Sequence, residues 1–382
     1  MTRDDIVARA ARLVPILRER AAKAESLRRL LDETVADLVA AGLTRTSQPA
    51  RFGGYELGWD VICEASMTLG RGDASQAWVA NVYAEHAFMA ALFPDQAQRD
   101  VWGTNPEALI SASISPVGNR VEVVEGGHVL DGRWPFASGV HHSDWTIVGD
   151  LVRTGDTPAR HLFFLVPKAD REIVDDWYTA GMAGTGSTSV KLARVFVPAH
   201  RTLSNDDVAA GAAPGAQVNR NPLYRMPIFG FSNLALASVP VGVAEAMIEE
   251  FARFVAHRAA RNPATPALEA LYARLAESAA EVKAARLLIM NAAKDNMDKL
   301  VAGTRLDAAD GTRGMQQGAY ACVLARRAAG RLFEACGAHG IYLSNVMQRA
   351  FRDIYASTVH AGLNWDRAAL HYGQMAVEYS RS

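Results

Sequence analysis

The stretch Asp131-Gly132-Arg133-Trp134-Pro135-Phe136-Ala137-Ser138-Gly139 decides how this sequence is interpreted. In an extended strand, residues two apart share one face, so Trp134, Phe136 and Ser138 are expected to line one wall with a hydroxyl at its end. A flat apolar wall that ends in one hydroxyl suits a flat heterocycle with one polar edge. The alternative, a half-buried strand whose aromatic side chains belong to the core, stays open on the pattern alone.

The composition is that of a folded globular protein, and it excludes several classes of function. The 382 residues are 49% hydrophobic and 21% charged, with a formal net charge of −1. This charge provides no basic field for nucleic acid and no cationic surface for a membrane. The longest apolar runs, such as 234–243, are too short to span a bilayer, and the N-terminus lacks the apolar core of a signal peptide.

The chain has three cysteines, Cys63, Cys322 and Cys336, which are too few and too scattered for a disulfide framework. No Cys-x-x-Cys, His-Glu-x-x-His or calcium-loop pattern occurs, so no metal site is expected. No Gly-x-Gly-x-x-Gly follows a strand, so no nicotinamide-binding unit is expected either. We expect a reducing, cytoplasmic location.

Hydrophobic periodicity divides the chain into a helical region over 1–108, a β region over 109–220 and a long-helix region over 221–382. In the first region, Asp73-Ala74-Ser75-Gln76 has the form of a capping box that starts a helix. Short runs rich in β-branched and aromatic residues predict strands, and these runs are 121–124, 128–130, 145–148, 162–166 and 195–197. Ala-rich segments predict a bundle of long helices, over 234–258, 266–301 and 314–336. The fold class is therefore α+β.

Four motifs in this order resemble the acyl-CoA dehydrogenase superfamily: Arg51-Phe52-Gly53-Gly54, Ser111–Pro116, Asp131–Gly139, and Cys336–Gly340 followed by Arg349–Asp353. The resemblance covers nearly the whole chain. It implies an N-terminal helical domain, a central β-barrel-like domain and a C-terminal long-helix bundle. It also implies that the second and third motifs contact flavin, with an aromatic and a hydroxyl residue facing the isoalloxazine.

The departures from the superfamily point to one of its branches. Dehydrogenases of this kind use a Glu base after the Arg-Asp helix, and the corresponding stretch here, 353–366, has no Glu. In the superfamily, an Arg-x-x-Phe-Gly pattern holds the FAD diphosphate of a neighbouring subunit. Here Arg258 is followed by Ala259-Ala260-Arg261-Asn262-Pro263, so a resident, tightly held FAD is not expected. The strand over 134–139 and His360 before Leu363-Asn364-Trp365-Asp366 are instead similar to the two-component flavin-dependent monooxygenases, such as 4-hydroxyphenylacetate 3-hydroxylase oxygenase components.

That branch takes reduced flavin, FMNH2 or FADH2, from a separate flavin reductase. It then uses O2 as cosubstrate and forms a C4a-hydroperoxyflavin. The resemblance therefore implies an oxygenase component that hydroxylates a small aromatic substrate of phenol or indole type. It also implies a homotetramer assembled through the C-terminal helices.

The resemblance implies three catalytic residues. Ser138 is expected to donate a hydrogen bond to the flavin edge near N5, and His360 to serve as a hydrogen-bonding or acid/base partner. His86 is expected to contact a substrate hydroxyl. The implied cofactor-binding residues are Ser111, Ser113, Trp134, Phe136 and Ser138. Each of these residues also has an ordinary structural interpretation, as a core, turn, strand or helix-surface residue.

Other functions stay open on the sequence alone. An acyl-CoA dehydrogenase or oxidase needs a carboxylate base, and the helix with Glu245, Glu249 and Glu250 is a candidate source. The same fold carries N- and S-oxygenases, and a flavin-binding scaffold without activity is a further alternative. Trp78, on the helix that carries His86, lines a substrate pocket or packs in the core. Arg352-Asp353 is expected to form an intersubunit or helix-packing ion pair.

Overall fold

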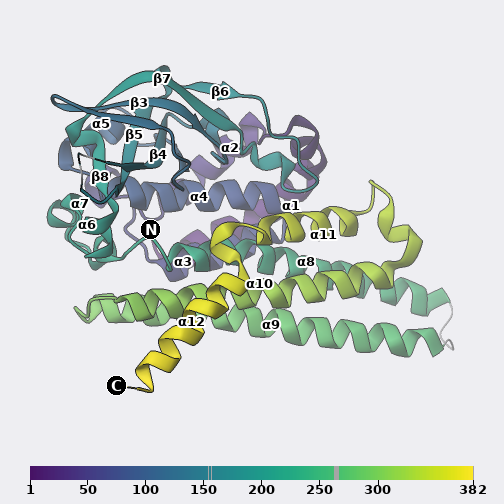
Figure 1. Ribbon diagram of the computed structural model, residues 1–382. Helices are drawn as coiled ribbons and strands as arrows, with labels where there is room; N and C mark the ends of the chain where they lie inside the picture. Colours follow the sequence, from purple (N-terminus) through teal and green to yellow (C-terminus); the bar gives the residue numbers. More distant parts are fainter. Residues whose placement is uncertain (154, 156, 262–265, 382) are drawn as a thin grey trace.

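The computed structural model describes residues 1–153, 155, 157–261 and 266–381, in an order of helices, β-structure and helices (Figure 1). Its N-terminal helices are α1 (Arg3–Leu27), α2 (Asp32–Ala40), α3 (Trp59–Gly70), α4 (Ala74–Ala91) and α5 (Asp95–Trp102). Short 3-10 turns at Leu43–Arg45 and Ala50–Phe52 lie between α2 and α3. These elements confirm the helical pattern predicted for the first hundred residues.

Helix α4 begins at the predicted cap and is buried along almost its whole length. The Asp73 carboxylate accepts a hydrogen bond of 2.9 Å from the backbone N–H of Gln76, which satisfies a donor that the first turn leaves free. All but one of its 18 residues are buried, and the exception, His86, is half-buried. A helix buried on every face must lie between two layers, and Figure 1 shows α4 between the β-structure and the long helices.

The β-region contains two four-stranded sheets. One has the order β1-β4-β5-β8 and the other β2-β3-β7-β6. The first consists of β1 (Ile110–Ser113), β4 (Trp145–Val152), β5 (Arg160–Pro167) and β8 (Thr202–Ser204). The second consists of β2 (Arg120–Val124), β3 (Gly127–Trp134), β7 (Ser189–Pro198) and β6 (Glu172–Val174). All five predicted strands are present.

The first sheet separates two hydrophobic cores. Side chains alternate between the faces of a strand, and accordingly Val148 and Phe164 pack into the core between the two sheets. Their chain neighbours Ile147 and Phe163 pack into the large core that fills the helices. This second core joins the β-region to the helical regions. The domain limits predicted from the sequence, at 108/109 and 220/221, therefore stay predictions.

Two short helices, α6 (Asn205–Ala209) and α7 (Pro214–Val218), lead into the C-terminal bundle. The long helices of the bundle are α8 (Ser232–Arg261), α9 (Pro266–Val301) and α10 (Ala308–Cys336), which lie side by side in Figure 1. They are followed by α11 (Val346–Thr358), the 3-10 turn η9 (Ala361–Leu363) and α12 (Trp365–Tyr379). The predicted α+β fold with a long-helix bundle is confirmed.

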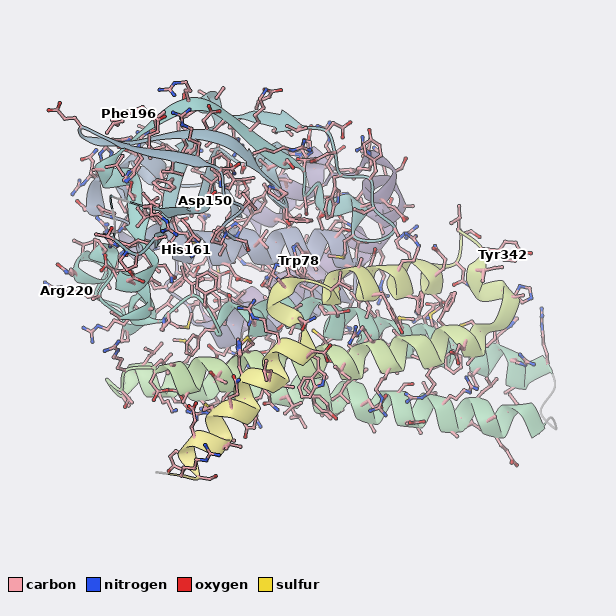
Figure 2. All side chains as sticks on the ribbon, in the orientation of Figure 1. Trp78, Asp150, His161, Phe196, Arg220 and Tyr342 are labelled. Carbon is pink, nitrogen blue, oxygen red and sulfur yellow. The ribbon has the colours of Figure 1, made fainter. Side chains whose placement is uncertain are left out.

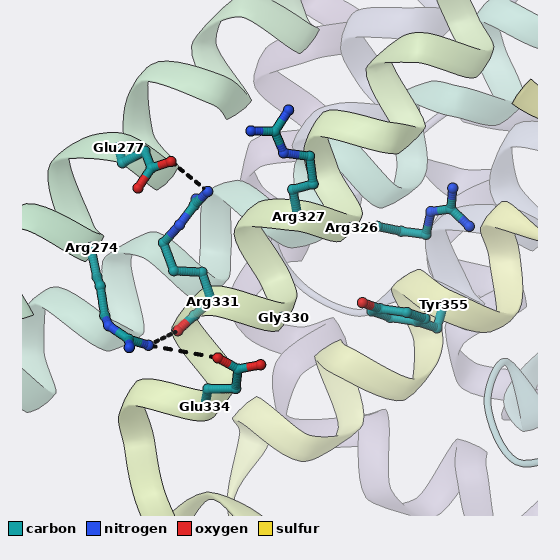
Figure 3. Close-up of a pocket in the computed structure, with 8 residues that line it drawn as sticks. All are labelled: Arg274, Glu277, Arg326, Arg327, Gly330, Arg331, Glu334 and Tyr355. Atoms are coloured by element: carbon teal, nitrogen blue, oxygen red, sulfur yellow. Dashed lines mark hydrogen bonds and ion pairs between the residues drawn. The ribbon is translucent and has the colours of Figure 1, made fainter.

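Two further observations concern the outside of the molecule. Among the residues that the structure describes, no helix is both long and apolar enough to cross a membrane. A hollow of about 460 Å³ opens between α9, α10 and α11 (Figure 3). Its lining consists of Arg274, Glu277, Arg326, Arg327, Gly330, Arg331, Glu334 and Tyr355. Ion pairs tie Arg331 to Glu277 at 2.8 Å and Arg274 to Glu334 at 3.7 Å, and none of the predicted site residues belongs to this hollow.

Candidate functional site

Trp78 brings together residues from all three regions of the chain. Its indole Nε1–H donates to the Ser138 hydroxyl oxygen at 3.2 Å, in the segment that follows β3. The same indole lies edge-on to the His360 imidazole, with ring centroids 5.8 Å apart and an interplanar angle of 61°. Figure 2 shows Trp78 between the β-region and the bundle. Two of the three predicted catalytic residues, Ser138 and His360, therefore lie on either side of one side chain from α4.

The segment with Ser138 is held in place by the backbone of Gly139. Gly139 has φ 72°, a conformation that favours glycine, and its carbonyl accepts a 2.6 Å hydrogen bond from the Tyr83 hydroxyl. A Cβ atom at position 139 would lie only 2.8 Å from that hydroxyl oxygen. Ser138 itself is 8% exposed, and its hydroxyl also bonds to the Ser187 hydroxyl at 2.7 Å.

The shared wall predicted for Trp134, Phe136 and Ser138 is wrong. Strand β3 ends at Trp134, and Phe136 has φ 65°, so the alternation of faces stops after Pro135. Trp134 has no exposed surface, packs in the core between the two sheets and donates from its indole to the Gly149 carbonyl at 3.0 Å. Its role in the structure is that of a core residue, because no face of the indole is left for a flavin.

Phe136 points the other way and is 68% exposed. Its ring meets the Trp177 ring edge-on, with centroids 6.1 Å apart. The positive φ turns the phenyl group out of the core, two residues from Ser138. An exposed aromatic ring two residues from Ser138 is a suitable surface for a flat ligand, and the contact of Phe136 with flavin stays a prediction.

His360 is held in one tautomer by its own turn. It caps η9, and its Nδ1 accepts the backbone N–H of Gly362 at 3.1 Å. Because that nitrogen accepts, the neutral ring carries its proton on Nε2, which has no protein partner among the described residues. His360 is an exposed residue, and desolvation by the protein around its ring lowers its pKa. His360 therefore presents an unused N–H donor.

His86 is held in the opposite tautomer. It lies on α4, eight residues after Trp78, which is a rise of about 12 Å along the helix. Its Nδ1 is 2.9 Å from the Ile110 carbonyl oxygen, and since a carbonyl only accepts, Nδ1 carries the proton. Burial lowers the pKa of His86 to about 4, so the ring is neutral at pH 7. Its Nε2 is left as an unprotonated acceptor, with no partner in the described part of the chain.

Ser111 and Ser113 are both buried on β1. Ser113 donates to the Pro135 carbonyl at 2.5 Å, so it adjoins the segment that carries Ser138. Ser111 accepts from the Ser143 hydroxyl at 2.9 Å and lies 2.8 Å from the Thr146 hydroxyl, in a separate polar cluster. The structure thus brings Ser113, but not Ser111, to the Ser138 segment through a direct bond. Contacts of either residue with flavin stay predictions.

The Arg-Asp helix α11 packs within the chain, as the helix-packing interpretation predicted. Arg352 pairs with Glu25 of α1 at 2.6 Å and donates to the Ala180 carbonyl at 2.6 Å. The Asp353 carboxylate accepts the Met182 backbone N–H at 2.6 Å. Burial raises the pKa of Asp353 to about 7. These contacts fix the start of the loop that carries Ser187.

The carboxylates suggested as dehydrogenase bases are engaged elsewhere. Glu245 pairs with Arg286 of α9 at 3.1 Å, and Glu249 with Arg71 at 2.5 Å. Glu250 pairs with Arg253 one turn along its own helix. In the described residues, none of the three forms a hydrogen bond or ion pair with Ser138, Trp78 or His360, so these carboxylates are engaged away from those residues.

Sequence reasoning missed the partners of Ser138. Ser187 bonds to the Ser138 hydroxyl, and Thr185 bonds to Ser187. Both lie in the Gly/Ser/Thr-rich loop after β6, whose composition was the only available signal, and these bonds depend on tertiary packing. A buried acid was also missed: Glu85 precedes His86, is 8% exposed and accepts from the Asn81 amide at 2.5 Å. Burial raises the pKa of Glu85 to about 8, so at pH 7 the carboxyl is mainly protonated.

Comparisons with known proteins agree with this arrangement. A family model described as acyl-CoA dehydrogenase, C-terminal domain, matches residues 234–365. The chain is 34% identical to HsaA, a flavin-dependent monooxygenase oxygenase subunit of Mycobacterium tuberculosis, over 96% of this chain and 94% of that protein. It is 32% identical to the oxygenase component of a FADH2-dependent resorcinol hydroxylase of Rhizobium sp., over 97% and 93%.

A solved structure gives the same result for the fold. The crystal structure of 3-HSA hydroxylase from Rhodococcus sp. RHA1 matches with a TM-score of 0.94 at 31% identity, covering 98% of this chain and 97% of that one. These likenesses extend over nearly the full chain, and they include all three regions that meet at Trp78. The chain belongs to the acyl-CoA dehydrogenase superfamily, in its branch of two-component flavin-dependent monooxygenases.

Proposed function

We propose that this protein is an oxygenase component that uses reduced flavin and O2 to hydroxylate a small aromatic substrate of phenol or indole type. One observation carries the proposal: two histidines near α4 are held in opposite tautomers, His86 as an acceptor and His360 as a donor. The relatives named above support it, since one is a FADH2-dependent resorcinol hydroxylase component. Either FMNH2 or FADH2 fits the proposal.

The residues around Trp78, where the three regions of the chain meet, fit the ring of a flavin. Ser138 offers a hydroxyl oxygen, His360 an unused N–H, and Phe136 an exposed aromatic face, within the same junction of the three regions. When bound, reduced flavin supplies the electrons that activate O2. The chain's own part is to hold the polar edge of the ring with Ser138 and His360, with Ser111 and Ser113 as further proposed contacts, and to keep water out.

His86 acts on the substrate. Its Nε2 is a neutral acceptor at pH 7, so it can take a hydrogen bond from a phenolic hydroxyl and polarise the O–H bond. Polarising that bond enriches the ring carbon ortho to the oxygen in electrons, which favours attack on an electrophilic oxygen atom. N- and S-oxygenation remain alternative outcomes on this fold. The neutral acceptor favours a substrate with an O–H or N–H donor on an aromatic ring.

We propose a separate flavin reductase as partner, because the oxygenase-component relatives are named as parts of such systems and the sequence has no nicotinamide motif. We also propose a homotetramer through the C-terminal helices. Large exposed apolar side chains over residues 341–377 support it, namely Ile341, Tyr342, Leu343, Val346, Val359, Leu370 and Val377. The three cysteines are buried and unpaired, which supports a reducing cytoplasmic location.

The test is a product assay with a phenol, an indole and an amine, with FMNH2 or FADH2 supplied by a reductase. Hydroxylated phenol or indole, formed only with O2 and reduced flavin, is the expected result. The matched assay contains acyl-CoA and an artificial electron acceptor without a reductase. Turnover in that assay, with none in the first, would replace the proposal with the dehydrogenase alternative.

A further inference from the structure

Helix α4 keeps its remaining accessible surface on one stripe. Trp78 is 7%, Val82 6% and Glu85 8% exposed, and His86 is half-buried, whereas every other residue of the helix is at most 4% exposed. These four residues follow the spacing i, i+4, i+7 and i+8, which puts them on one side of the helix. A helix that is otherwise enclosed by packing therefore borders accessible space along a single line, from Trp78 to His86.

One end of this stripe is surrounded by polar side chains from other elements. His360, which caps η9, lies edge-on to Trp78. A Cβ atom on Gly362 would lie 2.6 Å from the Asn233 side-chain oxygen, so Asn233 of α8 packs against the same turn. The Asn233 amide is more than nine-tenths buried and forms no hydrogen bond with any described residue. The accessible line along α4 thus starts beside unused polar groups of η9 and α8.

At the other end of the stripe, Glu85 has one carboxyl oxygen that the chain does not use. The Ser66 hydroxyl donates to the Asn81 side-chain oxygen at 2.8 Å, which turns the Asn81 amino group toward Glu85. That amino group donates to Glu85 Oε1 at 2.5 Å. Oε2 has no hydrogen-bond partner and no ion-pair partner in the described part of the chain. A carboxyl that is more than nine-tenths buried therefore leaves one oxygen for a ligand.

Burial keeps this carboxyl neutral in the free protein. Its pKa rises to about 8, because desolvation disfavours the charged form. The groups around it are also neutral at pH 7: His86 has its pKa lowered to about 4, and burial raises the pKa of the Cys63 thiol on α3 above its usual range. Residues 233–244 of α8 include no titratable side chain. Because a buried carboxylate needs a positive partner, Glu85 ionises only when a cation reaches it.

We propose that Glu85 binds the ammonium group of an amine-bearing phenol or indole, while His86 binds the ring hydroxyl or ring N–H of the same molecule. The two side chains are consecutive on α4 and border the same stripe, so one small substrate can reach both. The inference rests on the proposed function, and it names the substrate class for that site.

Binding of such a substrate includes a proton exchange. The ammonium pairs with the Glu85 carboxylate, and the proton that the carboxyl held in the free protein leaves to the buffer. The product of this exchange is a buried ion pair that keeps the hydrogen bond from Asn81. A substrate whose side chain ends in a carboxylate offers no such partner, and its negative charge opposes ionisation of Glu85.

The test is calorimetry of three phenols that differ in the side chain: tyramine, 4-ethylphenol and 4-hydroxyphenylacetate. Each is titrated into wild-type protein at pH 7, anaerobically with FMNH2 and again without flavin. Tyramine is expected to bind about 10- to 100-fold more tightly than 4-ethylphenol, the effect of a hydrogen bond between charged groups, and 4-hydroxyphenylacetate is expected to bind most weakly. Titration in two buffers of different ionisation enthalpy counts protons. With a pKa of about 8, about 0.9 proton should be released per tyramine at pH 7, and none with 4-ethylphenol.

Glu85→Gln removes the ionisable group and keeps an oxygen that accepts from Asn81. We expect the preference for tyramine to fall by the same 10- to 100-fold and the proton release to disappear, with binding of 4-ethylphenol unchanged. Glu64→Gln is the matched control. Glu64 is a carboxylate of α3 that pairs with Arg286 at 3.3 Å, outside the stripe, so the preference and the proton release should stay at wild-type values.

The outcomes separate this inference from the proposed function. In wild-type protein, tyramine binding without proton release, or no tighter than that of 4-ethylphenol, overturns the role of Glu85 without any variant. A Glu85→Gln protein with a wild-type melting temperature that keeps both the preference and the release overturns it as well. Absence of hydroxylated product from all three phenols in the reductase-coupled assay overturns the proposed function instead, since calorimetry involves no turnover.

Discussion

His86 and His360 occupy two contrasting regions of the molecule. His86 lies within the central helix α4, between two hydrophobic layers, and gives its Nδ1 proton to the Ile110 carbonyl. His360 lies in the exposed turn between α11 and α12 and uses Nδ1 to accept a backbone N–H. The same side chain thus presents an accepting nitrogen in one region and a donating nitrogen in the other. The backbone group that faces Nδ1 decides which ring nitrogen carries the proton: a carbonyl oxygen for His86 and an N–H for His360.

Replacing His86 by Ala should have the largest effect. Hydroxylation is expected to fall by about 10- to 100-fold, the effect of losing a hydrogen-bond acceptor to a group that gains charge, while binding of reduced flavin stays close to wild type. The measurement is product formed per reduced flavin in single turnovers.

His86→Asn is the matched control for the base. Its amide N–H can take the place of Nδ1–H against the Ile110 carbonyl, but it has no basic nitrogen. We expect it to be as inactive as the Ala variant. An active Asn variant would show that His86 only anchors β1.

Replacing His360 by Ala should have a moderate effect, about tenfold, because one hydrogen-bond donor is lost and chemistry at His86 is untouched. The affinity for reduced flavin and the rate of hydroxylation are the quantities to measure. His360→Gln supplies an amide donor near the position of Nε2 and is expected to recover most of the loss. Wild-type behaviour of the Ala variant would remove His360 from the site.

Ser138→Ala should change the fate of oxygen more than the overall rate. Without the hydroxyl that holds the ring edge, hydrogen peroxide released per product is expected to rise several-fold. Peroxide and product are measured in the same reaction. Coupling at the wild-type value would contradict a contact between Ser138 and the flavin.

The smallest effect concerns pH. Burial lowers the pKa of His86 to about 4, so the neutral base is present above pH 4 and is lost as the pH falls through that value. Between pH 5.5 and 8 the rate of hydroxylation in single turnovers should therefore be nearly flat. An inflexion near pH 6.5, the ordinary value for histidine, would mean that the base is a solvated residue.

Much of the fold could be predicted because it depends on local patterns. Helical spacing, the Asp73 cap and the Gly- and Pro-bounded strands each involve neighbours in sequence, and each is present in the structure. The wall of Trp134, Phe136 and Ser138 could not be predicted correctly, because one positive φ at Phe136 ends the alternation. A strand pattern gives no sign of such a residue when it is not glycine.

Only part of the candidate site could be predicted from the sequence. The family resemblance indicated Ser138, His86 and His360, whose catalytic roles stay predictions, and Trp78 was weighed as a pocket or core residue. Its actual contacts, with Ser138 on one side and His360 on the other, join positions 60 and 282 residues away in the chain. The bonds from Ser138 to Ser187 and from Ser187 to Thr185 similarly depend on a loop that packs against the segment after β3. Contacts of this kind arise from packing, which periodicity does not encode.

The anchor between Asp353 and Met182 has a consequence for biosynthesis. The loop with Thr185 and Ser187 is made early, but the carboxylate that fixes its start is made 171 residues later, and His360 later still. A growing chain that has folded its β-region therefore lacks the bond from Met182 to Asp353 and the contact of Trp78 with His360 until α11 and η9 have left the ribosome. The place where the three regions of the chain meet is therefore completed only near the end of synthesis.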